Sequence, residues 1–244
     1  MDGLKKEVLK KPYKLLCAVA LLLCVCKEIP EHCGNYVLID PNTGKCETEN
    51  EKAPLEETTP PETATPVIYH DRDGKKYGTV KIGTQNWMAE NLNYDTADGT
   101  LSWCYDCAKY GRLYTWNAAK TACPSGWHLP SRDEWDKLAK SVGGTEAFSG
   151  DNHHWNGAGK ALKSKKGWYN NGNGMDDYKF SALPGGYRSP NGKYYSAGDY
   201  GYWWTAAEYG SNAYHRDMDY NDDYLSEYYN DKSRAYSVRC LEDN

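Results

Sequence analysis

Apolar residues recur with the period of an α-helix in the middle of the chain. The apolar stripe consists of Trp135, Leu138, Ala139 and Val142, spaced i, i+3, i+4 and i+7. Ser131 and Glu134 stand three positions apart just before this stripe and form a capping-box signature, while Gly143-Gly144 is typical of a helix end. The pattern predicts a helix over about residues 132–142.

A second, shorter helix is predicted immediately upstream. Trp116, Ala119 and Cys123 repeat at helical spacing, and Thr115 is a suitable N-cap residue. The turn-forming run Pro124-Ser125-Gly126 then separates the two helices. Cys123 therefore ends the first helix on its apolar side.

The remaining apolar pattern is that of short strands. The strand candidates are residues 77–82 after a turn at 71–74, a hairpin at 82–87, a hairpin at 180–195, a run at 202–206 and a last strand at 236–241. Asn191-Gly192 is the strongest short hairpin signal among them. In the last strand Val238 and Cys240 alternate with Arg239, so we expect a half-buried strand with Cys240 on the Val238 face. Two short helices among many short strands indicate an α+β domain.

Residues 1–26 have the pattern of a secretory signal peptide. A lysine-rich start is followed by the apolar run Leu15 to Cys26, which is shorter than the about 20 residues that a membrane-spanning helix needs. No Ala-x-Ala cleavage motif is present, and Cys24 and Cys26 are alternative sites of lipid attachment, as in a lipoprotein signal. We expect export, with membrane contact only through this signal or a lipid anchor.

The cysteines agree with export. Of the nine cysteines, three lie in the expected signal, which leaves an even number for disulfide bonds in an oxidising compartment. Spacing suggests pairs Cys33–Cys46 and Cys104–Cys107, which leaves Cys123 for Cys240. If residues 1–26 are not a signal, reduced thiols in the core become the better interpretation.

Composition divides the chain after the signal into three parts. Residues 27–48 fit a small hairpin closed by Cys33 and Cys46. Residues 49–66 are rich in Thr, Pro and Glu and cannot support a core, so they predict an extended linker, either a plain spacer or an O-glycosylated stalk. Residues 67–244 form one domain that is long enough for a single core.

The net charge indicates which classes of binding partner are unfavourable, and the aromatic content indicates how the core packs. Loss of residues 1–26 removes five lysines and two acids and moves the formal net charge from −5 to −8. An acidic chain without a cluster of Lys and Arg is a poor partner for nucleic acid or for an anionic membrane. With 9 Trp and 22 Tyr but 2 Phe, the core must pack through aromatic rings whose polar edges form hydrogen bonds.

Five sequence blocks now indicate a family. They are YGTVKIGTQNWMAENLNY, KYGRLYTWNAAKTACPSGWHLPSRDEW, FSALPGGYR, GYWWTAAE and SVRCLED, in this order over about residues 70–243. Together they resemble the Fibrobacter succinogenes major paralogous domain family, which is similar to the C-type lectin-like fold. The resemblance implies two helices, small antiparallel sheets, a long irregular loop region and a disulfide from Cys123 to Cys240. It also implies an exported bacterial protein, at the cell surface, in the outer membrane or outside the cell.

Binding through the irregular loop is the first functional hypothesis. Binding residues concentrate on loops, and residues 149–178 combine rings for sugar faces with amides and carboxylates for hydroxyl groups. The candidate ligand-binding residues are Trp155, Trp168, Tyr169, Asn170, Asn171, Asn173, Asp176 and Asp177. The expected partner is a polysaccharide or, for a structural or adhesive surface protein, another protein. The alternative is that the tryptophans belong to the core and the asparagines form turns.

No cofactor is expected, with calcium as the alternative. Lectins of this fold often bind calcium through acid-containing motifs, but the corresponding runs here, Ser189-Pro190-Asn191 and Trp204-Thr205-Ala206, lack the acids. Other oxygen ligands are available in the groups Asn173/Asp176/Asp177 and Asp217/Asp219/Asp222/Asp223. Neither group matches an EF-hand, and both are typical of solvated acidic loops.

An enzyme is the less favoured alternative. Residues 126–139 also resemble the formylglycine-generating sulfatase-modifying group, whose members hold copper with two cysteines; here the pair would be Cys104 and Cys107. A structural disulfide explains these two residues better. The adjacent His153-His154 pair is a weak metal candidate, because neighbouring side chains rarely point the same way. His128, which follows Trp127 in the turn, is expected to cap a helix or to bond a backbone carbonyl. No catalytic motif stands out, and we expect a non-catalytic protein.

Overall fold

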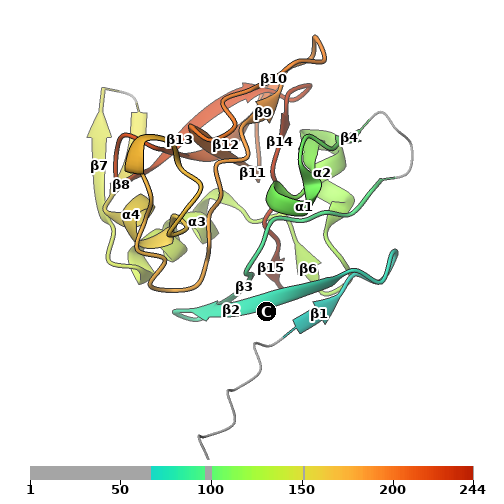
Figure 1. Ribbon diagram of the computed structural model, residues 1–244, viewed down its shortest axis with the longest axis horizontal. Coiled ribbons are helices and arrows are strands. Elements are labelled where there is room, and N and C mark those ends of the chain that lie inside the picture. The colour runs from blue at the N-terminus through green and yellow to red at the C-terminus, as the bar shows by residue number, and fades with distance from the viewer. Residues whose placement is uncertain (1–66, 97–100, 151, 244) are drawn as a thin grey trace, which may run out of the picture. The chain divides into compact units, whose positions relative to one another are not determined.

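The computed structural model describes residues 67–96, 101–150 and 152–243 (Figure 1). The expected signal, the hairpin with Cys33 and Cys46 and the linker lie outside the described residues. The helices are α1 (Cys107–Tyr110), α2 (Trp116–Ala122), α3 (Arg132–Ser141), α4 (Ala158–Leu162) and the 3-10 helix η1 (Tyr169–Asn171).

The strands of the described part are β1 (Val67–Tyr69), β2 (Lys76–Ile82), β3 (Gln85–Met88), β4 (Ser102–Trp103), β5 (Leu113–Thr115), β6 (Trp127–His128), β7 (Thr145–Ser149), β8 (Asn152–Asn156), β9 (Tyr187–Arg188), β10 (Tyr194–Tyr195), β11 (Tyr200–Tyr209), β12 (Asn212–Asp219), β13 (Tyr224–Asp231), β14 (Ala235–Tyr236) and β15 (Leu241–Glu242). They form three antiparallel sheets in the orders β1-β2-β3-β15-β6, β10-β9-β14-β5-β4 and β11-β12-β13-β8-β7. Few helices beside mostly antiparallel sheets confirm the predicted α+β class.

The local sequence signals are confirmed where they were strongest. The side chain of Ser131 accepts a hydrogen bond from the backbone of Glu134, and Glu134 bonds back to the Ser131 backbone, so α3 begins with a complete capping box. Thr115 caps α2 through the Ala118 backbone. The β2–β3 and β9–β10 hairpins occur at the predicted positions.

Two aromatic clusters form the core between these elements. In one, the apolar face of α3 packs Trp135 against Trp87 of β3, with ring centroids 5.0 Å apart. In the other, α2 packs beside Trp204 of β11 and Tyr236 of β14, whose rings lie 4.3 Å apart. β11 contributes to both clusters because neighbouring residues point to opposite faces of a strand.

The last segment differs from its prediction. Residues 235–241 are all buried, so the chain here is not half-buried as the alternation suggested. β14 joins one sheet and β15 another, and the residues between them cross the interior. Arg239, expected to face solvent, is fully buried and donates to Asn91 Oδ1 and to the carbonyls of Met88 and Phe180.

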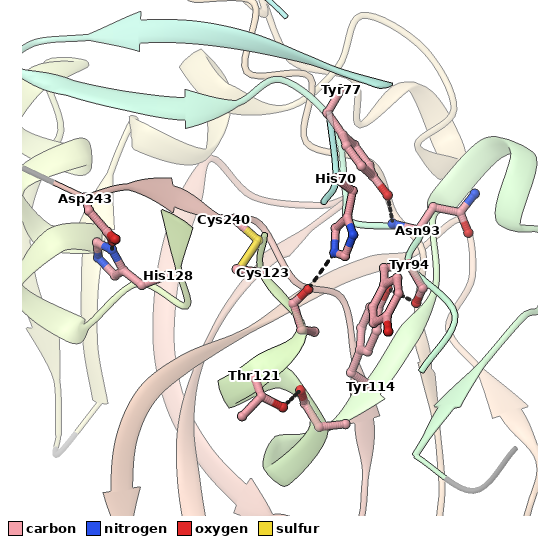
Figure 2. The surroundings of a disulfide bond; sticks show 12 residues. His70, Tyr77, Asn93, Tyr94, Tyr114, Thr121, Cys123, His128, Cys240 and Asp243 are labelled. Atoms are coloured by element: carbon pink, nitrogen blue, oxygen red, sulfur yellow. Dashed lines mark hydrogen bonds and ion pairs between the residues drawn. A yellow bond between two sulfur atoms is a disulfide. The ribbon is translucent and has the colours of Figure 1, made fainter. Parts of the chain in front are cut away.

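A disulfide joins this segment to α2. Cys123, directly after α2, is bonded to Cys240 with a Cα–Cα distance of 5.9 Å, as Figure 2 shows. Beside it, the buried ring of His70 lies 3.0 Å from the carbonyl oxygen of Ala122. A second disulfide links Cys104 to Cys107. Both predicted pairings within the described residues are present.

The region predicted as one long loop, residues 149–178, is partly regular. β8, α4 and η1 all lie within it. In addition, β12 and β13 were not predicted, because their sequences, NAYHRDMD and YLSEYYND, do not alternate regularly between apolar and polar residues. Asp217 and Asp219, predicted to lie in a solvated acidic loop, are buried residues of β12.

Candidate functional site

Trp155 and Trp168 do not offer ring faces to a ligand. Trp155 on β8 is 2 % exposed and its Nε1 donates to Asp136 Oδ1 at 2.7 Å. Trp168 is 5 % exposed and its Nε1 donates to the Ala182 carbonyl at 3.1 Å. Their prediction as ligand-stacking residues is wrong because both indoles fill the core, which was the alternative interpretation.

Two further candidates, Asn173 and Asp176, shape the chain after Trp168. Asn173 Oδ1 accepts a hydrogen bond from the Trp168 backbone at 3.1 Å. The two oxygens of Asp176 accept bonds from the backbone and the hydroxyl of Ser181, both at 2.7 Å. These two side chains hold turns, whereas Asp177 is exposed.

Tyr169 and Asn171 remain accessible, and they lie at an open hollow of about 590 Å³. We call it the loop hollow. It is lined by Lys160, Lys163, Asn170, Asn171, Gly172, Tyr220, Asn221, Asp222, Asp223 and Tyr224. Tyr169 stands at its border, since its ring lies edge-to-face on Tyr220 at 5.4 Å. The hollow therefore forms between η1 and the turn that joins β12 to β13.

The η1 side of the hollow has an unusual backbone. Asn170 and Asn171 both have positive φ, 47° and 61°, a conformation that asparagine adopts more readily than most other residues except glycine. Gly172 follows, and a Cβ on it would overlap the carbonyl of Tyr220. The absence of a side chain at Gly172 allows the two walls of the hollow to approach.

Lys163 fixes the opposite wall. Its side chain is buried, and its ammonium group donates to the carbonyl oxygens of Asp219 at 2.9 Å and Asp222 at 2.6 Å. Burial lowers the pKa of this lysine. Because its ammonium group is bonded to backbone carbonyls, Lys163 orders the β12–β13 turn. Lys160 is a second, half-exposed cation at the hollow.

Two carboxylates at the β12–β13 turn already accept hydrogen bonds from the backbone of the turn. Asp219 Oδ1 accepts from the Asn221 backbone and Asp222 Oδ1 from the Tyr224 backbone, at 3.2 and 2.9 Å. Burial raises the pKa of Asp222. Within residues 67–96, 101–150 and 152–243, no three His, Cys, Asp or Glu side chains are grouped so that they could hold a metal ion.

The lining of the hollow suits a polar, hydroxyl-rich ligand. Amides of Asn170, Asn171 and Asn221 can donate and accept, and the carboxylates of Asp222 and Asp223 accept. The tyrosine rings supply apolar faces with polar edges. Sequence reasoning missed the β12–β13 half of this site, because its acids were assigned to a solvated loop.

The residues of the enzyme alternative do not form a common site. Cys104 and Cys107 are joined in a disulfide and therefore offer no thiol pair to copper. His153 and His154 point to opposite faces of β8: His153 stacks on Phe148 and His154 packs on Tyr224. His128 contacts the carboxylates of Asp243 at 2.6 Å and Glu134 at 3.0 Å, and not a backbone carbonyl.

Comparison with known families identifies the chain. The profile of the Fibrobacter succinogenes major domain family matches residues 80–242, and the protein belongs to this family. No curated protein and no solved structure matches the chain. In the part of the chain that the structure describes, no helix has the length and apolar character needed to cross a membrane.

Proposed function

We propose that the protein is an exported, non-catalytic module that binds polysaccharide at a bacterial cell surface. The observation that carries this proposal is the loop hollow, in which amides, carboxylates and tyrosines converge between two walls held by Gly172 and Lys163. Such a mixture of polar groups and ring faces is what a sugar chain requires. Helices α2 and α3, the small sheets and the disulfide from the end of α2 to the residue before β15 support a C-type lectin-like arrangement.

Export is supported by two independent observations. Disulfides such as Cys123–Cys240 persist in oxidising compartments, and residues 1–26 have the sequence of a signal peptide. Because the acids Asp219 and Asp222 accept backbone hydrogen bonds in the turn, we propose binding that is independent of calcium.

The first test is binding of the oxidised full chain to a panel of plant and bacterial polysaccharides. We expect binding that EDTA leaves unchanged and that the double change Tyr169→Ala, Asn171→Ala weakens by about tenfold, since both side chains are exposed at the hollow. Isothermal titration calorimetry measures the affinity.

The matched control is the pair Tyr105→Ala, Asn117→Ala, also exposed but away from the hollow. Equal affinity of both double variants would reject the hollow as the site. Loss of binding in EDTA would replace the calcium-independent proposal, and absence of binding to every polysaccharide would reject the sugar ligand.

Lys163→Met gives a second test of the hollow. The change leaves the Asp219 and Asp222 carbonyls without their donor, so we expect a loss of about 1–3 kcal/mol in unfolding free energy and weaker polysaccharide binding. Lys165→Met, at an exposed position, should change neither quantity. Urea unfolding and calorimetry measure the two effects, and unchanged binding by a folded Lys163→Met protein would contradict the role of this wall.

Adhesion to another protein is the second candidate. Tyr209, Tyr214 and Tyr229 form a cluster on β11, β12 and β13, with Tyr209 and Tyr229 rings 4.4 Å apart. Tyr209 and Tyr229 are about half exposed. Exposed tyrosines are enriched at protein interfaces, which is the observation that favours this candidate.

A further inference from the structure

One face of the β11-β12-β13-β8-β7 sheet carries a row of polar residues that the loop hollow does not use. The register pairs Tyr202 with Asp217, Asp217 with Ser226, and Ser226 with His154. Cross-strand partners lie side by side on the same face, so these four residues form one row across four strands. We call this face the tyrosine face.

Aromatic rings border the row on both sides. Tyr200 stacks on Tyr202 at 5.5 Å, and Tyr228 lies two residues from Ser226 on the same side of β13. Ser226 is the small residue of the row, whereas Tyr228 beside it is 40 % exposed. The short serine side chain between larger neighbours leaves the row accessible from solvent.

Asp217 is the unusual member of the row. The residue is 7 % exposed, and its Oδ1 has no hydrogen-bond partner among the described residues. The nearest cationic candidate is His215 Nδ1 at 3.7 Å, which is too long for a hydrogen bond. Oδ1 itself is buried, while the side chain as a whole keeps 10 % exposure, so the carboxyl group lies just beneath the surface of the tyrosine face.

Arg216, the neighbour of Asp217 in β12, forms no ion pair with the Asp217 carboxylate on the tyrosine face. Neighbouring residues of β12 point to opposite sides, and Arg216 pairs with Glu227 and Asp136, both at 2.7 Å, on the side covered by α3. Burial lowers the pKa of His215 to about 3, so this ring is neutral. On the tyrosine side, the guanidinium of Arg234 lies over the ring of Tyr187, 5.1 Å from its centroid.

The electrostatic environment of the face is negative. Burial, with the charges of Asp222 and Asp219, raises the pKa of Asp217 to about 7, while the charge of Arg216 opposes this rise. The other titratable groups facing Asp217 are Tyr200 and Tyr202 of β11, Tyr228 of β13, His154 of β8 and Tyr236 of β14. Burial and the charge of Asp217 together raise the pKa of Tyr202 and Tyr228.

These features indicate which chemical group would bind the Asp217 carboxylate. The unpaired oxygen needs a donor, and the ionised carboxylate needs a positive charge, which a sugar hydroxyl cannot supply. A primary ammonium group carries three donors, no acceptor and one positive charge, and tyrosine rings attract it through their π faces. We propose that the tyrosine face is a second binding site, which takes the ammonium group of an alkylamine, with Asp217 as the counter-ion.

The test uses 1,5-diaminopentane and its neutral N,N′-diacetyl derivative on the oxidised full chain. We expect saturable binding of the diamine and at least about tenfold weaker binding of the diacetyl compound, which lacks the charge. Asp217→Asn should weaken diamine binding by about tenfold or more, and Tyr228→Ala by about threefold.

A pH series supplies a readout that a purely structural role would not change. Asp217 is protonated below its pKa and ionised above it, while the amine stays charged to about pH 10. Affinity should therefore rise between about pH 5.5 and about pH 8.5, with proton release at binding, and this rise should disappear in Asp217→Asn.

Two controls separate this site from general effects. Asp133→Asn removes the same charge from the α3 side of the sheet and should leave diamine affinity unchanged. The double change Tyr169→Ala, Asn171→Ala should weaken polysaccharide binding and not diamine binding. Equal affinity of wild type and a folded Asp217→Asn protein, equal binding of the diacetyl compound or no diamine binding at all would overturn the proposal.

Discussion

Replacing Cys123 and Cys240 by alanine should lower the free energy of unfolding by about 4–5 kcal/mol. The bond connects residues separated by 117 positions, and the chain-entropy account gives bonds over such long loops the largest stabilisation. Cys240, in the segment between β14 and β15, is fully buried, so its loss also removes packing. Urea unfolding of the two-alanine variant and the wild-type chain, both under non-reducing conditions, measures the difference.

The Cys104–Cys107 bond provides the matched control. Its sequence separation is 3, so the same account gives its removal a loss of only about 2 kcal/mol. If both double variants lost the same stability, loop length would not explain the effect. Free thiols at Cys123 and Cys240 in protein purified under non-reducing conditions would contradict the structure itself.

Arg239→Ala should cost about 3–5 kcal/mol of unfolding free energy. Arg239 is fully buried, and its guanidinium donates to Asn91 Oδ1 at 2.9 Å and to the carbonyls of Met88 and Phe180. Truncation leaves these acceptors unsatisfied and opens a cavity, and each unsatisfied buried acceptor costs about 1–3 kcal/mol. Burial lowers the pKa of Arg239 to about 9, so the group is still charged at neutral pH.

Arg239→Lys separates the charge from the geometry of the guanidinium. Lysine keeps the positive charge but cannot reach Asn91 and two carbonyls with one planar group, so a smaller but clear loss is expected. Among the described residues no salt bridge to Arg239 occurs, and the hydrogen bonds and the contact of the guanidinium with the Phe180 ring, 4.4 Å away, therefore carry the effect. A loss below about 1 kcal/mol in urea unfolding of Arg239→Ala would show that the bonds contribute little.

The sequence predicts those parts of the fold that depend on neighbouring residues. The capping box of Ser131 and Glu134 determines where α3 begins, and Asn191-Gly192 determines the turn between β9 and β10. These signals act within a few residues, so they are visible in one chain. The family was also evident from sequence, and its profile match covers the same region.

The remaining features depend on contacts between distant residues. Arg239 looks like the exposed member of an alternating strand, and only its bonds to Asn91, 148 positions away, explain its burial. Asp217 looks like part of an acidic loop until β12 is paired with β11 and β13. For the candidate site, Tyr169 and Asn171 were predicted, while its other wall at Tyr220 was not, because that wall belongs to a turn between unpredicted strands.

The Cys123–Cys240 bond closes a covalent ring that contains both proposed binding surfaces. The loop hollow and the tyrosine face are built from residues between these two cysteines. The entropic cost of closing a ring rises only with the logarithm of its length, about 0.6 kcal/mol for each doubling. Insertions at exposed turns within the ring, such as the one at Gly210, should therefore change what the domain recognises far more than they change its stability.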